Sequence, residues 1–132
     1  MIDRPAYMVK IRKTETKRGV EITLKYFDFL DHHVEDVING RTDEFMELNQ
    51  IASVLAVSHK HLTDTIQKEK GNHPCHFYDE KIIEKAKALL TETTLPVAHI
   101  AMKLTYDPSN FSKFFKKWTG MTPGNFRNSE TK

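Results

Sequence analysis

The chain has 132 residues, 39% of them hydrophobic, so it can bury a modest core in one small domain or two very small ones. Its single cysteine, Cys75, excludes an internal disulfide and suits a reducing compartment. No apolar run approaches the roughly 18 residues of a membrane helix, and the N-terminal sequence lacks the apolar core of a secretion signal. We therefore expect a cytoplasmic protein without membrane contacts.

The net charge of +2 is small, but the charges are unevenly distributed. Residues 4–18 carry a net charge of +5, and residues 19–46 carry a net charge of −5. Further on, Lys113, Lys116 and Lys117 bring three positive charges onto one short predicted helix. Concentrated positive charge of this kind favours an anionic partner more than the total charge does.

The N-terminal residues 1–18 show no hydrophobic period and are expected to form a basic arm, either mobile or weakly extended. The following residues 21–40 place apolar side chains at helical spacing and end in Asn39-Gly40, which predicts a helix that stops there. These apolar positions are Phe27, Leu30, Val34, Val37 and Ile38.

Two short helices joined by a tight turn are predicted next. Leu48, Ile51, Ala52 and Leu55 form one apolar stripe, and Val57 anchors the turn. Ser58 is a good N-cap for the second helix, whose stripe contains Leu62, Ile66 and the aliphatic stem of Glu69. Gly71 suits the position just after that helix.

A longer amphipathic helix is predicted over residues 75–90, with Phe77, Ile83, Ala86, Leu89 and Leu90 on one face. Residues 91–94 are expected to break it. This helix links the first helical pair to a second one.

The second pair repeats the first at an offset of 49 residues without a gap. Ile100, Ala101 and Leu104 correspond to Ile51, Ala52 and Leu55, while Tyr106, Phe111, Phe115, Gly120, Pro123 and Phe126 correspond to Val57, Leu62, Ile66, Gly71, Pro74 and Phe77. Asp107 takes the place of the Ser58 cap, and Pro108 suits the first helical position. We expect Phe111, Phe114, Phe115 and Trp118 to form the buried stripe of the last helix.

Each pair consists of a helix, a capped turn and a second helix, with a small alanine near the point where the two helices cross. This arrangement is typical of helix-turn-helix proteins. The predicted fold is all-α, with two homeodomain-like three-helix units joined by the long linking helix. We expect the basic arm over residues 1–18, the first subdomain over 19–74, the linking segment over 75–94, and the second subdomain with a short tail over 95–132.

The chain resembles the DNA-binding domain of the AraC/XylS family of bacterial transcription regulators over about 80 residues, from Glu47 to Arg127. The most specific part is the second half, with LLTETTLPVAHIA, FSKFFKKWTG and MTPGNFR. The resemblance implies two helix-turn-helix subdomains that put one recognition helix each into successive major-groove segments. It therefore implies sequence-specific binding of duplex DNA near promoters, with RNA polymerase as a further partner.

Three features depart from the family pattern. Only Thr105 and Tyr106 precede Asp107, where the family usually has Gly-Phe and one more residue, and Ile82 replaces a frequent arginine. The 46 residues before Glu47 are too few to enclose a small ligand, so we expect a stand-alone DNA-binding regulator or a fragment.

The last helix has an outward face that suits DNA. Ser109, Ser112 and Lys113 are the expected base-facing residues, since serine can pair with several base edges and lysine can reach the O6 and N7 acceptors of guanine. Lys116 and Lys117 lie nearer the helix end and are expected to contact phosphates.

Subtracting 49 gives the outward face of the first recognition helix. Lys60, Thr63 and Gln67 are its expected base-facing residues, and His59 at the start is an expected phosphate contact. Asp64 falls on the same face, where phosphates would repel it unless it accepts from a cytosine amino group or is neutralised by Lys60 or Lys68. We expect pairing, and weaker DNA binding by the first unit than by the second.

Chemistry of other kinds has little support in the sequence. The histidines at 59, 61, 73 and 76 and the single cysteine lack metal-ligand spacing, so no metal site is expected. There is no Gly-rich phosphate loop, carboxylate pair or nucleophile elbow, so neither an enzyme nor a cofactor is expected.

Two alternative functions remain open on the sequence alone. The aromatic helix over residues 26–38 could make the chain a helical protein-interaction module, and the basic surfaces could belong to a non-specific architectural DNA binder. The duplication within one chain favours a monomer or a weak dimer that binds an asymmetric site.

Overall fold

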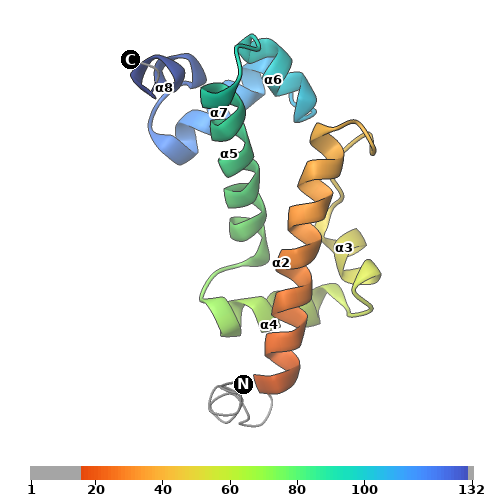
Figure 1. The fold of residues 1–132 in the computed structure, drawn as a ribbon. Coiled ribbons are helices and arrows are strands. Elements are labelled where there is room, and N and C mark those ends of the chain that lie inside the picture. The colour runs from red at the N-terminus through yellow and green to blue at the C-terminus, as the bar shows by residue number, and fades with distance from the viewer. Residues whose placement is uncertain (1–15, 131–132) are drawn as a thin grey trace, which may run out of the picture. The chain divides into compact units, whose positions relative to one another are not determined.

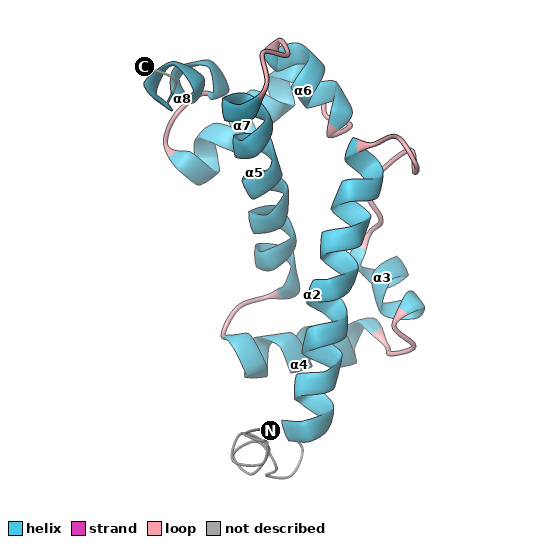
Figure 2. Cartoon of the chain, viewed as in Figure 1, coloured by secondary structure: helices cyan, strands magenta, loops and turns pink. Residues whose placement is uncertain are grey.

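A computed structural model of the chain describes residues 16–130 and contains, within that range, seven helices and no strand (Figures 1 and 2). The helices are α2 (Thr16–Ile38), α3 (Leu48–Val54), α4 (His59–Lys70), α5 (Pro74–Glu92), α6 (Val97–Lys103), α7 (Pro108–Thr119) and α8 (Pro123–Glu130). The predicted all-α class is confirmed. None of these helices is both long enough and apolar enough to cross a membrane.

The contacts divide the chain into two compact units that alternate along the sequence. Unit 1 contains residues 16–30 and Met46–Phe77, and unit 2 contains Asp31–Phe45 and residues 78–130. The divisions fall inside α2 and inside α5, so both helices supply residues to both units. The predicted subdomains 19–74 and 95–132, by contrast, were continuous stretches.

The first long helix starts earlier than its hydrophobic pattern suggests. Helix α2 begins at Thr16 rather than Glu21, so residues 16–18 of the predicted arm are helical, while residues 1–15 lie outside the described range. Its end was predicted correctly: Gly40 has a left-handed φ of +76°, and the Arg41 N–H donates to the Asp36 carbonyl over 2.8 Å. This closure satisfies carbonyl groups that the last turn leaves open.

Unit 1 packs the first part of α2 against α3 and α4. Its fully buried side chains include Tyr26, Leu30, Ile51, Leu62 and Ile66. The Tyr26 hydroxyl donates to the Pro74 carbonyl over 2.8 Å, which satisfies a polar group inside the core. Figure 1 shows α4 crossing this part of α2.

Unit 2 joins the last part of α2 to α5, α6, α7 and α8. Its core contains Val34, Ile82, Ile83, Ala86, Leu90, Ile100, Ala101, Leu104, Phe111 and Phe115, all buried. Lys81 pairs with Asp31 over 2.6 Å, and Lys85 pairs with Glu35, so two charged pairs fix α5 on α2 within this unit. The Asp31 hydrogen bond raises the pKa of Lys81, and the Lys85 hydrogen bond lowers the pKa of Glu35.

A buried histidine packs among aromatic rings in unit 2. His33 on α2 makes edge contacts with Phe45 and Tyr78, at centroid distances of 5.8 Å and 6.3 Å. Burial lowers the pKa of His33 below its usual 6.5, and the nearby Asp36 opposes this effect only in part. The native state therefore favours the neutral imidazole.

Helix α8 occupies residues for which the sequence suggested only a tail. Pro123 fits the first helical position, and the Thr122 hydroxyl accepts from the Asn125 N–H over 3.2 Å. Arg127 of α8 donates from Nε to the Leu90 carbonyl over 2.9 Å and from a terminal nitrogen to the Thr93 carbonyl over 3.2 Å. These bonds anchor α8 on the end of α5.

Candidate nucleic-acid interface

The two helix-turn-helix pairs repeat each other residue for residue in helix boundaries. Helix α3 runs from Leu48 to Val54 and α4 from His59 to Lys70. Adding 49 to each of these numbers gives the first and last residues of α6 and α7. The buried Ile51, Ala52, Leu62 and Ile66 correspond in the same way to the buried Ile100, Ala101, Phe111 and Phe115. The predicted duplication is thus present in the fold itself.

The tight turn after the first helix of each pair has the same unusual backbone. Ala56 and Thr105 both adopt left-handed φ values, +62° and +61°. The following residues, Val57 and Tyr106, donate their N–H groups to the carbonyls of Ala52 and Ala101 over 3.0 Å and 2.9 Å. This is a Schellman closure, which normally uses glycine at the left-handed position because a Cβ there is unfavourable.

Both recognition helices start and stop as the sequence predicted. The Ser58 hydroxyl accepts from the His61 N–H over 3.0 Å, and the Asp107 carboxylate accepts from Ser109 and Asn110 over 3.1 Å and 3.3 Å. Gly71 and Gly120 then end α4 and α7 with φ values of +83° and +85°. The caps fix the length and direction of each helix, and with them the side chains that it exposes.

The inner side of α7 is aromatic. Phe111 and Phe115 are fully buried, whereas Phe114 and Trp118 of the predicted stripe are half-buried. Phe114 stacks on Tyr106 at a centroid distance of 5.3 Å and an interplanar angle of 17°. This packing turns the opposite side of α7 toward solvent.

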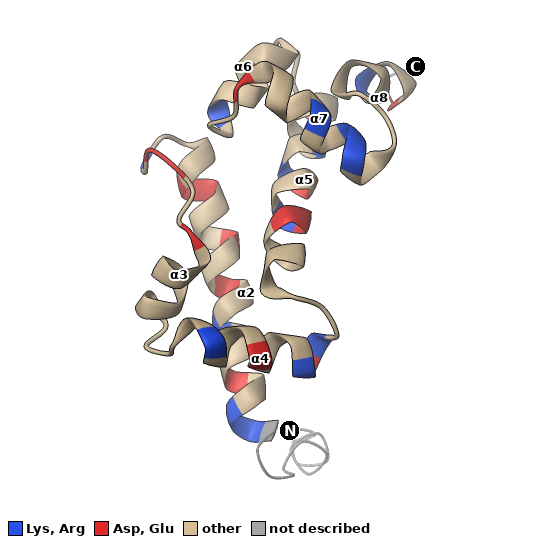
Figure 3. Ribbon diagram, turned by 180° about the vertical axis from the view of Figure 1, so that it is seen from behind, with Lys and Arg blue, Asp and Glu red and all other residues tan. Residues whose placement is uncertain are grey.

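The outer side of α7 is polar, and all of its charged side chains are positive. Ser109, Lys113, Lys116 and Lys117 are exposed, while Ser112 is half-buried at the edge of the aromatic stripe. Asp and Glu are absent from Pro108–Thr119, and Figure 3 shows the basic segments of α7 in blue. The helix thus brings together hydrogen-bonding groups and positive charge on one accessible face.

The outer side of α4 has the same layout but mixed charge. His59, Lys60 and Gln67 are exposed, and Thr63 is half-buried, in the position equivalent to Ser112. Lys60 donates to the Asp64 carboxylate over 2.9 Å, which confirms the expected pairing. Figure 3 shows basic and acidic segments together on α4. This ion pair offsets one of the positive charges that α4 presents.

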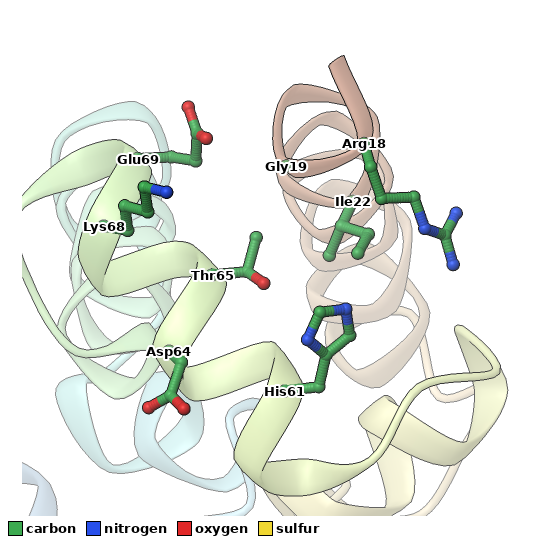
Figure 4. A pocket seen from close by; sticks show the side chains of 8 residues that line it. All are labelled: Arg18, Gly19, Ile22, His61, Asp64, Thr65, Lys68 and Glu69. Atoms are coloured by element: carbon green, nitrogen blue, oxygen red, sulfur yellow. The ribbon is translucent and has the colours of Figure 1, made fainter. Parts of the chain in front are cut away.

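The structure contains a groove beside α4 that was not predicted from the sequence. It has a volume of about 270 Å³ and lies between α4 and the first turns of α2 (Figure 4). Its walls are formed by Arg18, Gly19, Ile22, His61, Asp64, Thr65, Lys68 and Glu69. The excess of positive charge before residue 19 was the only signal, and it did not indicate the helix against which this charge would lie.

The part of the chain that the structure describes contains no cluster of possible metal ligands. Between residues 16 and 130, no three His, Cys, Asp or Glu side chains lie close enough to hold a metal ion. Cys75 is exposed, and its N–H donates to the His73 ring nitrogen Nδ1 over 3.0 Å.

Taken together, two capped helix-turn-helix units, each with an exposed polar helix face, define the class as a DNA-binding protein with two helix-turn-helix motifs. A family model described as "Helix-turn-helix domain" matches residues 51–129. The chain belongs to this family, in its AraC type, which is a family of transcription regulators.

Known proteins with similar sequences and folds agree with this placement. The arabinose operon regulatory protein of Escherichia coli is 29% identical over 103 residues, which cover 74% of this chain and 35% of that protein. The C-terminal domain of AraT, a response regulator from Geobacillus stearothermophilus, is 30% identical with a TM-score of 0.71, and the match covers 82% of this chain and 84% of that one.

A third match shares the fold at low sequence identity. The DNA-binding domain of AdpA, a global transcriptional factor solved in complex with a target DNA, has a TM-score of 0.67 at 16% identity, covering 81% of this chain and 90% of that one. The chain spans between 13% and 37% of the lengths of the curated relatives that it matches.

Proposed function

We propose that the chain regulates transcription by binding duplex DNA at specific sites, with α4 and α7 each placed in a major-groove segment. One observation carries the proposal: the same turn, cap, glycine stop and exposed polar face occur twice at a constant offset of 49 residues. A single motif could be a plain helical hairpin. Two motifs of the same backbone geometry that both present polar helices are typical of proteins that read adjacent sites on DNA.

The residues of α7 divide into readers and phosphate contacts. Ser109, Ser112 and Lys113, in the first half of the helix, are the proposed base-reading residues, because the N-terminal part of a recognition helix reaches the base edges. Lys116 and Lys117 lie in the last turn and are the proposed phosphate contacts.

The residues of α4 follow from the repeat. Lys60, Thr63 and Gln67 are the proposed readers, and His59 at the helix start is a proposed phosphate contact. The Lys60–Asp64 pair reduces the positive charge of this face, so α4 contributes less affinity than α7. The preferred site therefore has two unequal elements.

The partners follow from the same arrangement. Since both reading helices belong to one chain, a monomer or weak dimer is sufficient for binding, and RNA polymerase is the partner through which a bound regulator would act. The AdpA domain, which shares the fold, was solved with a target DNA, and this supports duplex DNA as the ligand class. The cytoplasm is the compartment in which this activity would take place.

In vitro selection of random duplexes by the chain tests the proposal. The expected result is enrichment of a site with two unequal elements about ten base pairs apart. Binding without enrichment at any salt concentration would instead indicate an architectural binder, and absence of binding would favour a protein-interaction module. Sedimentation of the complex with the selected duplex would show whether one or two chains bind.

A further inference from the structure

The groove between α2 and α4 lies beside the proposed DNA-reading face. Arg18 and Ile22 of α2 form one wall, and His61, Thr65 and Glu69 of α4 form the other (Figure 4). All these residues belong to unit 1. The groove and α4 therefore belong to the same compact unit.

The groove and the reading face share a border on α4. Successive residues of a helix are rotated by about 100°, so His61 and Lys68 lie on the flank next to Lys60 and Gln67. Asp64 belongs both to the outward face and to the groove lining. A duplex seated on the outward face would bring a strand backbone past this flank.

Gly19 brings the first turn of α2 close to α4. A Cβ at this position would overlap the Glu69 carboxylate, so a larger residue would displace that side chain and begin to fill the groove. Arg18 precedes Gly19 in this turn, and Figure 4 shows its side chain pointing away from Glu69.

The side chain of Arg18 is suited to a phosphate. It forms an ion pair with Glu21 at 3.4 Å, and the two side chains are 58% and 54% exposed. An ion pair so exposed to water is weak, and it can be exchanged for a stronger bond when an anion arrives. The planar guanidinium donates two parallel hydrogen bonds to phosphate oxygens, which lysine cannot do.

We propose that Arg18 of α2 binds a backbone phosphate on the strand that borders the major-groove segment read by α4. This proposal rests on the proposed DNA-binding function and adds a contact from outside the helix-turn-helix motif. The contact clamps unit 1 onto the duplex from the side of the groove, and it supplies affinity that the mixed charge of α4 lacks. It carries no sequence information itself.

The test compares Arg18→Gln with Lys17→Gln on the selected duplex over a range of salt concentrations. Lys17 is a matched control, because it is exposed in the same turn and does not line the groove. Loss of one phosphate contact should reduce the log–log salt slope by about 0.9 for Arg18→Gln. The slope for Lys17→Gln should change less, and the preference for the selected site should stay the same in both variants.

A phosphate scan makes the assignment specific. A neutral methylphosphonate is placed at one backbone position of the duplex at a time. At one position it should weaken binding by the unaltered chain but cause no further loss of binding by Arg18→Gln. That position should flank the element assigned to α4. Arg18→Lys should retain the salt slope but bind less tightly, because the paired hydrogen bonds are lost.

The outcomes separate this proposal from the function on which it rests. If Lys116→Ala lowers the slope while Arg18→Gln leaves it unchanged, the chain binds DNA and the Arg18 contact is wrong. The Arg18 contact would also be wrong if every methylphosphonate weakened binding by Arg18→Gln as much as it weakens binding by the unaltered chain. If the unaltered chain selects no site, the proposed function itself fails.

Discussion

Ala56 and Thr105 lie 49 residues apart and share a left-handed backbone, with φ values of +62° and +61°. Neither residue is glycine, although both sit where the chain must turn between the two helices of a motif. The turn geometry is thus retained at the expense of local strain, and the strain is larger for Thr105 because its side chain is β-branched.

Thr105→Gly should stabilise the protein by about 1 kcal/mol, because glycine removes the Cβ penalty at the left-handed position. Ala56→Gly should give a smaller gain, since alanine has no branch at Cβ. Chemical denaturation of both variants would measure the change. A loss of stability in Thr105→Gly would mean that the hydrogen bond from its hydroxyl to the Leu104 carbonyl, 2.6 Å long, outweighs the strain.

Lys116→Ala and Lys117→Ala should each weaken binding to all duplexes alike and lower the log–log salt slope by about 0.9, because phosphate contacts release counterions. Titrations at several salt concentrations measure the slope. Lys87→Ala is the control in the same unit, since Lys87 is exposed on α5 and lies over the Phe126 ring instead of on α7. Slopes equal to that of the unaltered chain would remove both lysines from the interface.

Asp64→Ala should tighten binding to non-specific DNA, because it removes a negative charge from the reading face and releases Lys60 from its ion pair. Competition with bulk duplex DNA would measure this effect. Asp64→Asn offers a control of the same shape and should act in the same direction. Loss of preference at a single base pair, without tighter non-specific binding, would show that Asp64 reads a base.

The two recognition helices show how far sequence reasoning reaches. Ser58, Asp107 and Gly120 could be assigned in advance, because capping depends on a few neighbouring residues. The Lys60–Asp64 pair was likewise predictable from its spacing of four residues. Local rules therefore determined both motifs almost completely.

Features that depend on packing between distant segments could not be predicted. Helix α8 has little hydrophobic period, and it is held by bonds from Arg127 to carbonyls more than 30 residues earlier. The groove at Arg18 likewise exists because Gly19 lies against α4, which no periodicity indicates. The sequence shows which face of a helix is buried but not the helix that covers it.

Arg127→Ala should destabilise the protein by about 2 kcal/mol, because two carbonyl groups at the end of α5 lose charge-assisted hydrogen bonds. Arg127→Lys should be intermediate, since an ammonium group cannot reproduce the fork of the guanidinium. Thermal unfolding would compare the three proteins. Equal stability of the alanine variant would show that water replaces these bonds without loss.

Stability should fall as the pH drops below about 6.5, through the protonation of His33. Burial lowers the pKa of His33 in the native state, so in this range the unfolded chain binds more protons than the folded one. His33→Gln cannot titrate and should flatten this part of the profile. The lowered pKa of Glu35 acts only below its usual 4.5, so urea unfolding at pH 5 to 7.5 separates the two groups.

Helix α2 contributes to one unit up to Leu30 and to the other from Asp31 onward. Cutting the gene between the two motifs would therefore yield a C-terminal piece, residues 78–130, deprived of the Asp31–Phe45 segment on which Lys81, Lys85 and Tyr78 rest. Each unit is discontinuous in the sequence, so a fragment that carries one complete unit would have to include its own part of α2.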